Sequence, residues 1–279
     1  MKKITPVGVR DYLPHEVKAR QSIINKATAE FKSAGYEQVI TPLFEYWSTI
    51  EAVCGNCLSE QAITFFNPKG ELLVIRPDHT TAIARLAATR LREEKGPFQF
   101  YYSDAVYRLD PVNGETEHYQ LGVENIGNPG VEEEAKLIQT CINTIKALGI
   151  QKFSIELNHT NELNQKSQAE QTALSKRDYT SLSTLPIRSP LSEINATHPL
   201  NELKTELTKL GITHNIYLNE SIQTTTNDYD GMFFDCLIEG QGKPCGAGGR
   251  YDGLLEHFDI KQSAIGFALD YNVISEALK

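Results

Sequence analysis

The segment Gly246-Ala-Gly-Gly-Arg-Tyr-Asp-Gly253 is the part of the sequence that indicates the fold most specifically. Glycine has no Cβ, so a strand rich in glycine lets the backbone approach a bound molecule closely, and Tyr251 can offer its hydroxyl there. A plain glycine-rich turn is the alternative that this segment leaves open. The apolar stretch Met232–Ile238 before it, and Ile265–Leu278 after it, indicate that the segment continues a sheet.

Three helices are predicted from periodicity and from their ends. The apolar positions that follow Val17 recur at helical spacing as far as Gly35, where a left-handed C-cap fits. Residues Thr80–Arg92 alternate Ala, Ile and Leu with Arg, as an amphipathic helix does. Residues Val131–Leu148 begin with three glutamates close to the N-terminus and end with a lysine, which complements the helix dipole.

Short apolar and β-branched runs between these helices predict strands. They are Gln38–Thr41, Leu72–Ile75, Phe98–Leu109, His118–Ile126 and Phe153–Leu157. The turn chemistry of Asp110-Pro-Val-Asn-Gly114 predicts an antiparallel hairpin. Because the strands come in pairs without βαβ alternation, we expect an α+β fold with a mainly antiparallel sheet of six or seven strands flanked by helices.

Residues 158–213 are polar and loosely patterned, and only Leu200–Leu210 has helical spacing. We therefore expect one domain over residues 1–279 with a short insertion at 158–213.

The composition indicates the cellular compartment of the protein and the classes of partner that it can bind. The chain has 279 residues, of which 40% are hydrophobic, and no apolar run has the length of a signal peptide or a membrane span. Its five cysteines do not suggest a disulfide framework. A net charge of −9 provides no basic surface for extended nucleic-acid contact. We expect a cytoplasmic protein that binds neither membranes nor nucleic acid.

Several segments together resemble the class II aminoacyl-tRNA synthetases, specifically the catalytic domain of the histidyl-tRNA synthetase family. Gly8–Pro14 is similar to the family's opening segment, and Gly35–Glu45 resembles motif 1, whose proline lies at a dimer interface. Ile75–Thr81 resembles the histidine-binding turn. Tyr107-Arg108 with Tyr119–Glu124 resembles motif 2. The glycine-rich segment resembles the GGRYD strand beside the substrate imidazole, and residues 265–268 resemble the start of motif 3. The resemblance implies a homodimer.

The resemblance also implies a set of histidine-binding residues. An acid receives the α-amino group and a threonine supports it, an arginine contacts a carboxylate or phosphate, and Gln, Glu and Tyr side chains contact the amino acid. In this sequence they are Asp78, Thr80, Arg108, Gln120, Glu124, Tyr229 and Tyr251. Each segment alone has a structural alternative: Pro-Asp before a helix is often a cap, and Gln120 and Glu124 fit a solvent-facing row on a strand.

The sequence departs from the synthetase pattern where ATP would be handled. Thr224 stands where the resemblance implies a catalytic arginine, and Val273 where motif 3 implies another. Losing one positioned cation removes about 3 kcal/mol of transition-state stabilisation. The loop Gly114-Glu-Thr-Glu117 adds acids that repel ATP and tRNA. Since the resemblance ends with motif 3, close to Lys279, we expect no anticodon-binding domain.

The sequence retains the residues implied for amino-acid binding and lacks several implied for ATP binding. This combination resembles the regulatory subunit family of ATP phosphoribosyltransferase. The resemblance implies a non-catalytic subunit that senses histidine and assembles with a short-form catalytic subunit in a hetero-oligomer. No cofactor is implied, and the sequence has no P-loop. Two alternatives stay open: a degenerate histidyl-tRNA-synthetase-like enzyme that still forms an adenylate, and a tRNA-sensing pseudo-synthetase.

Cysteines and histidines give no strong metal signal. One C-x-x-C pair, Cys54 and Cys57, is weak evidence for zinc without a second pair. Cys141, Cys236 and Cys245 are expected to fill core space. His79 and His118 lie near the inferred pocket, where we expect structural roles. We therefore predict no metal site.

Overall fold

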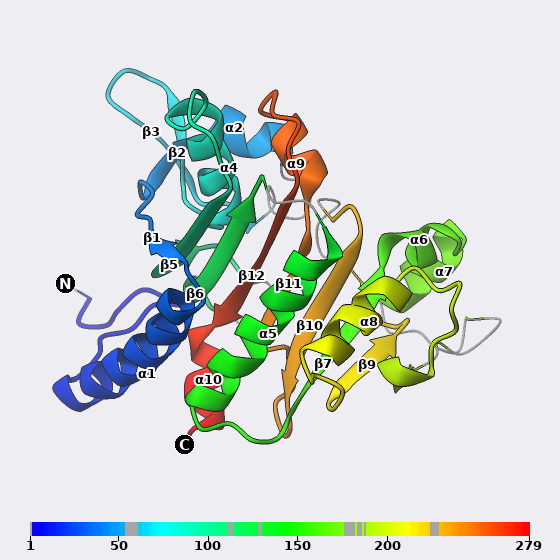
Figure 1. Ribbon diagram of the computed structural model, residues 1–279. Coiled ribbons are helices and arrows are strands. Elements are labelled where there is room, and N and C mark those ends of the chain that lie inside the picture. Colours follow the sequence, from blue (N-terminus) through cyan, green and yellow to red (C-terminus); the bar gives the residue numbers. More distant parts are fainter. Residues whose placement is uncertain are drawn as a thin grey trace.

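A nine-stranded sheet forms the centre of the molecule in the computed structural model, which describes residues 2–53, 61–110, 114–127, 130–175, 182, 186, 188–223 and 229–279 (Figure 1). In spatial order its strands are β1 (Glu37–Gln38), β5 (Phe98–Tyr107), β6 (Glu117–Ile126), β12 (Ala264–Asp270), β11 (Gly246–Arg250), β10 (Met232–Ile238), β7 (Phe153–His159), β9 (Ile216–Asn219) and β8 (Arg188–Pro190). Neighbours pair antiparallel except β1 with β5 and β7 with β9, which are parallel. The predicted α+β fold with a mainly antiparallel sheet is confirmed.

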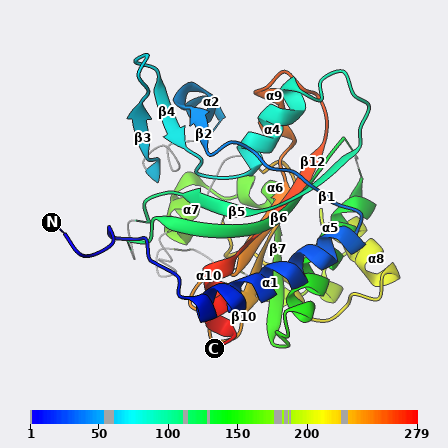
Figure 2. The same ribbon diagram turned by 90° about the vertical axis from the view of Figure 1, so that its left-hand side faces the viewer.

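A second, smaller sheet lies on one side of β5 and β6, opposite α1 (Pro14–Ser33), as Figure 2 shows. Its strands, in spatial order, are β2 (Phe44–Tyr46), β4 (Leu72–Ile75) and β3 (Thr64–Phe66). Three helices accompany it: α2 (Trp47–Val53), α4 (Thr80–Thr89) and α9 (Asp252–Glu256). One apolar cluster joins these elements to the main sheet, through residues that include Ile50, Val74, Ile83, Leu255 and Tyr102.

Helices α1, α5 (Val131–Ala147) and α8 (Asn201–Lys209) cover the other face of the main sheet, and α5 crosses its central strands (Figure 1). Short elements complete the chain: α6 (Thr160–Asn164), α7 (Gln168–Ser175), the 3-10 turn η2 (Leu191–Glu193) and α10 (Tyr271–Ala277). Helix α1 is the longest, with 20 residues. None of the helices in the described ranges is both long and apolar enough to cross a lipid bilayer.

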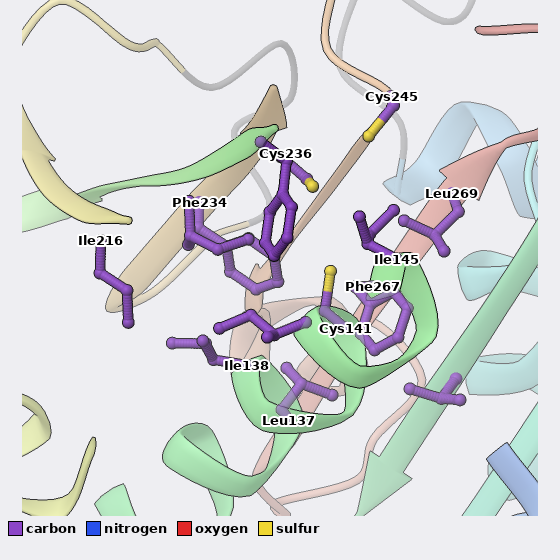
Figure 3. Close-up of a cluster of buried hydrophobic side chains, with 14 of the residues drawn as sticks. Leu137, Ile138, Cys141, Ile145, Ile216, Phe234, Cys236, Cys245, Phe267 and Leu269 are labelled. Atoms are coloured by element: carbon purple, nitrogen blue, oxygen red, sulfur yellow. The ribbon is translucent and has the colours of Figure 1, made fainter. Parts of the chain in front are cut away.

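The main core lies between α5 and the central strands. Figure 3 shows Leu137, Ile138 and Cys141 of α5 packed toward Phe234 of β10 and Phe267 of β12. All are at most 2% exposed, and burying an apolar side chain of this size contributes about 1.5–3 kcal/mol. Gly248 on β11 makes this packing possible, because a Cβ there would press against both phenylalanine side chains. The three cysteines Cys141, Cys236 and Cys245 are buried and unpaired, as expected of core residues.

Long elements lie where the sequence predicts them. Helix α1 is followed by Gly35 at φ +94°, the left-handed turn expected there. Helix α5 matches its prediction at the first residue, and β4 matches Leu72–Ile75 at both ends. Strands β5 and β6 form the predicted antiparallel hairpin, with Tyr107 opposite Glu117 at its end.

The expected count of six or seven strands is wrong, because short edge strands extend the sheet to nine within the described residues. Gln38–Thr41 is not a strand of four residues, since regular pairing ends at Gln38 and Pro42 provides no N–H to continue it. Strand β8 has three residues, an arginine and a proline among them, so no alternation marks it. Strand β4, predicted as Leu72–Ile75, pairs in the smaller sheet and not in the main one.

Residues 158–213 contribute to both the sheet and the core. Helix α8 forms where the helical spacing of Leu200–Leu210 predicts it, and Leu203 and Leu207 enter the main core. Strand β8 becomes the outer edge of the main sheet. The description of this stretch as an insertion within one domain remains a prediction.

Arg76 joins the smaller sheet to the hairpin. Its side chain is 2% exposed and donates to the Thr41 carbonyl at 2.9 Å and to the Ala105 carbonyl at 2.6 Å. It also forms an ion pair of 2.9 Å with Asp104. One guanidinium therefore joins the end of β4 to acceptors on two other segments, the stretch around Thr41 and strand β5.

We expect Arg76→Leu to lower the free energy of unfolding by about 2–4 kcal/mol, because it leaves buried carbonyls without a donor. Chemical denaturation followed by circular dichroism measures this change. The control is Arg90→Leu, an exposed arginine at the end of α4. Equal losses in the two variants would show that the Arg76 contacts contribute nothing specific.

Candidate functional site

One pocket gathers all seven residues predicted from the sequence. It has a volume of about 490 Å³ and is lined by Asp78, Thr80, Arg108, Gln120, Glu124, Tyr229 and Tyr251, together with small residues of the sheet. Gln120 and Glu124 of β6 line the pocket, whereas Leu121 and Val123 between them belong to the main core. The pocket therefore lies on the sheet face opposite α5.

Glu124 is the most constrained polar group in the pocket. Its side chain is 1% exposed, and its carboxylate accepts hydrogen bonds from Thr80 Oγ1 at 2.8 Å, from Tyr102 at 3.4 Å and from the Tyr251 hydroxyl. Burial raises the pKa of Glu124 to about 8, although the three hydroxyl donors favour the ionised form. Near neutral pH this carboxyl can either donate or accept a hydrogen bond.

Gly266 makes room for this carboxylate. It lies opposite Glu124 on β12, and a Cβ at Gly266 would overlap the Glu124 Oε2 atom. Ala268 and Ala247 continue the same surface, so that small residues form the floor of the pocket.

Asp78 has a structural contact as well as a place in the pocket. Its Oδ1 accepts from the Thr81 N–H at 2.6 Å and its Oδ2 from the Thr81 hydroxyl at 3.1 Å. These bonds cap the start of α4, so the capping alternative raised from the sequence is present too. Burial raises the pKa of Asp78, while the Thr81 bonds and Arg108 oppose the increase.

Arg108 and Tyr229 line other parts of the pocket. Arg108 donates to the Pro77 carbonyl at 3.2 Å, just before the Asp78 turn. Among the lining residues that the structure describes, it is the one cation. The Tyr229 ring stacks on Phe233, with centroids 5.8 Å apart.

His79 and His118 are buried beside the pocket without lining it. The His79 ring stacks on Tyr102 at 4.2 Å between centroids, and burial lowers its pKa to about 3, so the ring is neutral at physiological pH. This contact supports the hydroxyl that Tyr102 presents to Glu124.

Two acids that line the pocket, Asp235 and Asp270, were not predicted from the sequence, and neither was Tyr102, which contacts Glu124. Tyr102 lies opposite Gly122, where a Cβ would overlap the tyrosine hydroxyl. Asp235 and Asp270 line the pocket from β10 and the end of β12. Alternation along β10 is the signal that could have found Asp235, because Phe233 and Asp235 point away from the core that holds Phe234 and Cys236.

The departures from the synthetase pattern fall in different places. Val273 is 1% exposed in the main core, so a buried apolar residue stands where the resemblance implies the motif 3 arginine. Glu115 in the acidic loop forms an ion pair of 3.2 Å with Lys243. Thr224 and the Cys54 and Cys57 pair lie outside the described residues.

Comparison with known proteins agrees with this arrangement. The sequence matches the family described as histidyl-tRNA synthetase over residues 8–210 and 190–274, and the chain therefore belongs to this family. Its fold is that of the class II synthetases, confirming the resemblance noted in the sequence. Within the family the chain is similar, over nearly its whole length, to regulatory subunits of ATP phosphoribosyltransferase.

The relatives are similar at modest identity and high coverage. The regulatory subunit from Carboxydothermus hydrogenoformans is 29% identical, covering 99% of this chain and 97% of that protein. The one from Ruminiclostridium cellulolyticum is 27% identical, covering 99% and 76%. A solved structure described as an ATP phosphoribosyltransferase regulatory subunit/histidyl-tRNA synthetase from Bacillus halodurans has a TM-score of 0.89 at 26% identity, covering 100% and 84%.

We expect Glu124 to make the stability of the purified chain depend on pH. Its pKa in the folded chain, about 8, is above the ordinary 4.5, so its contribution to stability is complete below pH 4.5 and is lost as the pH rises toward 8. Between pH 5 and 8 the unfolding free energy should fall more steeply in the wild type than in Glu124→Gln, by up to about 1.4 kcal/mol per pH unit.

Urea denaturation at several pH values measures the two slopes. Glu239→Gln removes an exposed carboxylate and should keep the wild-type slope. Parallel curves for wild type and Glu124→Gln would refute the raised pKa.

Gly266→Ala should displace Glu124 from its three donors, because the added methyl overlaps Oε2. We expect a loss of stability of about 2–4 kcal/mol, as for other overpacked sites that also break buried hydrogen bonds. Thermal denaturation is the measurement, and Gly242→Ala, at a glycine with open space around it, is the matched control. A wild-type melting curve for Gly266→Ala would contradict the close approach.

Proposed function

We propose that this chain is a regulatory, non-catalytic subunit of ATP phosphoribosyltransferase that binds histidine in the pocket around Glu124. The observation that carries the proposal is that one pocket holds every amino-acid-binding residue implied by the synthetase resemblance. The positions implied for the ATP-binding arginines hold Thr224 and Val273 instead. The residues implied for binding histidine are kept, and two of the cations implied for forming an adenylate are missing.

The pocket offers complementary groups for each part of histidine. Glu124, with Thr80 and Tyr251 beside it, can pair with an imidazole nitrogen as donor or acceptor, because its pKa lies near neutrality. Asp78 and Gln120 supply acceptors for an ammonium group, and Arg108 supplies a cation for a carboxylate. Tyr229 contributes an aromatic wall.

Feedback requires only that histidine bind two arrangements of the assembly with different affinity. We propose that the catalytic chemistry belongs to a short-form ATP phosphoribosyltransferase catalytic subunit, and that histidine in this pocket favours an arrangement in which that partner turns over slowly. The assembly is a cytoplasmic hetero-oligomer that catalyses the first step of histidine biosynthesis. This chain contributes to it without binding a cofactor.

A homodimer within that assembly is supported by the surface around the motif 1 segment. Ile40 is 81% exposed, Phe44 50% and Tyr46 53%, and Phe66 of the same small sheet is 70% exposed. Apolar side chains gathered in this way mark interaction surfaces.

We expect Asp78→Asn and Glu124→Gln each to weaken histidine binding about ten- to hundred-fold, since each replaces a carboxyl group that a ligand group contacts by an amide with different hydrogen-bonding atoms. Titration calorimetry of the chain with histidine measures this loss. Asparagine can still cap α4, so Asp78→Asn leaves the fold in place. Glu239→Gln is the control and should bind like the wild type.

The same variants test the regulatory role when they are mixed with the short-form catalytic subunit from the same source. Histidine inhibition should weaken in parallel with binding, while assembly measured by size-exclusion chromatography stays unchanged. Unaltered inhibition would rule out this pocket as the sensor. Failure to bind the catalytic subunit, together with histidine-dependent pyrophosphate exchange, would point instead to a degenerate synthetase.

A further inference from the structure

Two acids that line the pocket, Asp235 and Asp270, have no role in the histidine contacts proposed above. Those contacts come from the turn into α4, from Arg108 after β5, from β6 and from the two tyrosines, whereas these acids come from β10 and the end of β12. Sequence resemblance assigns neither of them. The surroundings of these two acids determine which ligand charges the pocket accepts near them.

Asp235 lies beside a second carboxylate that is already fully paired. Its register partner on β7 is Glu156, which is 0% exposed. Glu156 accepts from Arg188 Nε at 3.0 Å and Nη2 at 2.7 Å, from Ser154 at 2.6 Å and from Asn219 at 3.1 Å. The only nearby guanidinium in the described strands of this edge is therefore bound to Glu156 in a bidentate pair.

Asp235 itself has no such partner. Within the described ranges, no hydrogen bond or ion pair joins its carboxylate to another residue, although the side chain lines the pocket. Burial, and then the neighbouring Glu156 charge, raise the pKa of Asp235 to about 6. At pH 7.5 it still carries a negative charge, which faces the pocket without compensation.

Asp270 occupies the position where a helix would favour an anion. Its Oδ1 accepts from the N–H groups of Asn272 at 2.7 Å and Val273 at 3.3 Å, at the start of α10. Exposed N–H groups at a helix N-terminus attract phosphate, but here a side-chain carboxylate already uses them. Burial and Arg108 lower the pKa of His118 nearby, so this imidazole adds no positive charge at neutral pH.

We propose that Asp235 and Asp270 are specificity-determining residues that exclude phosphate-bearing ligands, above all nucleoside triphosphates, from the pocket. Asp235 and Asp270 line the pocket with Arg108 as the one cation among its described lining residues, so their carboxylates oppose the entry of a triphosphate and leave an amino acid with a cationic ammonium group unaffected. Exclusion by negative charge is a separate effect from the loss of the binding arginines. The inference rests on the proposed function in taking this pocket as the histidine site. The exclusion of phosphate would keep the sensor unresponsive to ATP, while the sensor still responds to histidine.

Asp235→Asn, Asp270→Asn and the double variant test this idea, because asparagine removes the charge and keeps the shape. Asparagine also caps a helix as well as aspartate, so α10 is preserved. Calorimetry with ATP in EDTA-containing buffer, to prevent metal bridging, should show at least about tenfold stronger binding in the double variant than in the wild type. Adenosine, which has no phosphate, should bind all the proteins equally. Asp235→Glu retains the charge and should keep the wild-type response to ATP.

Equal ATP affinity in wild type and double variant would overturn the proposal, and so would a gain for adenosine as large as that for ATP, since the effect would then be one of shape. Histidine titrations of the same proteins should agree within about threefold. If the wild type failed to bind histidine, the proposed sensor function would fall, while the comparison of ATP with adenosine would still decide whether these two acids exclude phosphate.

Discussion

The burial of one carboxylate, that of Glu124, is the constraint on which the arrangement of the pocket depends. A carboxyl group removed from water is costly unless donors surround it. Its donors come from three separate parts of the chain: Thr80 at the start of α4, Tyr102 on β5 and Tyr251 after β11. The smaller sheet and its helices must therefore be placed against the main sheet before Glu124 is satisfied, and Arg76 fixes that junction.

Side chains alternate between the two faces of the central strands, so that one face packs in the core and the other lines the pocket. On β10, Phe234 and Cys236 pack under α5, while Phe233 and Asp235 line the pocket. On β12, Phe267 and Leu269 belong to the core, and Gly266 and Ala268 belong to the floor. A shift in register by one residue would exchange the two faces, so the apolar core also determines which side chains reach the ligand.

Much of this arrangement could be predicted from the sequence, because long elements carry a period. Helix α5, with 17 residues, and strand β10, with seven, have enough residues for their pattern to show. The seven pocket residues could be named through the synthetase motifs, and the fold brings all of them together. Short strands such as β1 and β8 have no period to read, since neighbouring strands alone define them. Asp235 could not be assigned a role, because its importance depends on Glu156 and Arg188, which are distant in sequence and leave it without a partner among the described residues.

The floor of small residues limits how this pocket can change in evolution. Gly266, Ala268 and Ala247 have little or no side chain to lose, so almost any single substitution among them makes the cavity shallower. The backbone below is shared with a close-packed core, which resists being moved aside. New ligand preferences in such a scaffold must therefore arise from the walls, by changes of charge and hydrogen bonding at constant depth. The same cavity can pass from one small molecule to another of similar size far more readily than it can grow to enclose a larger one.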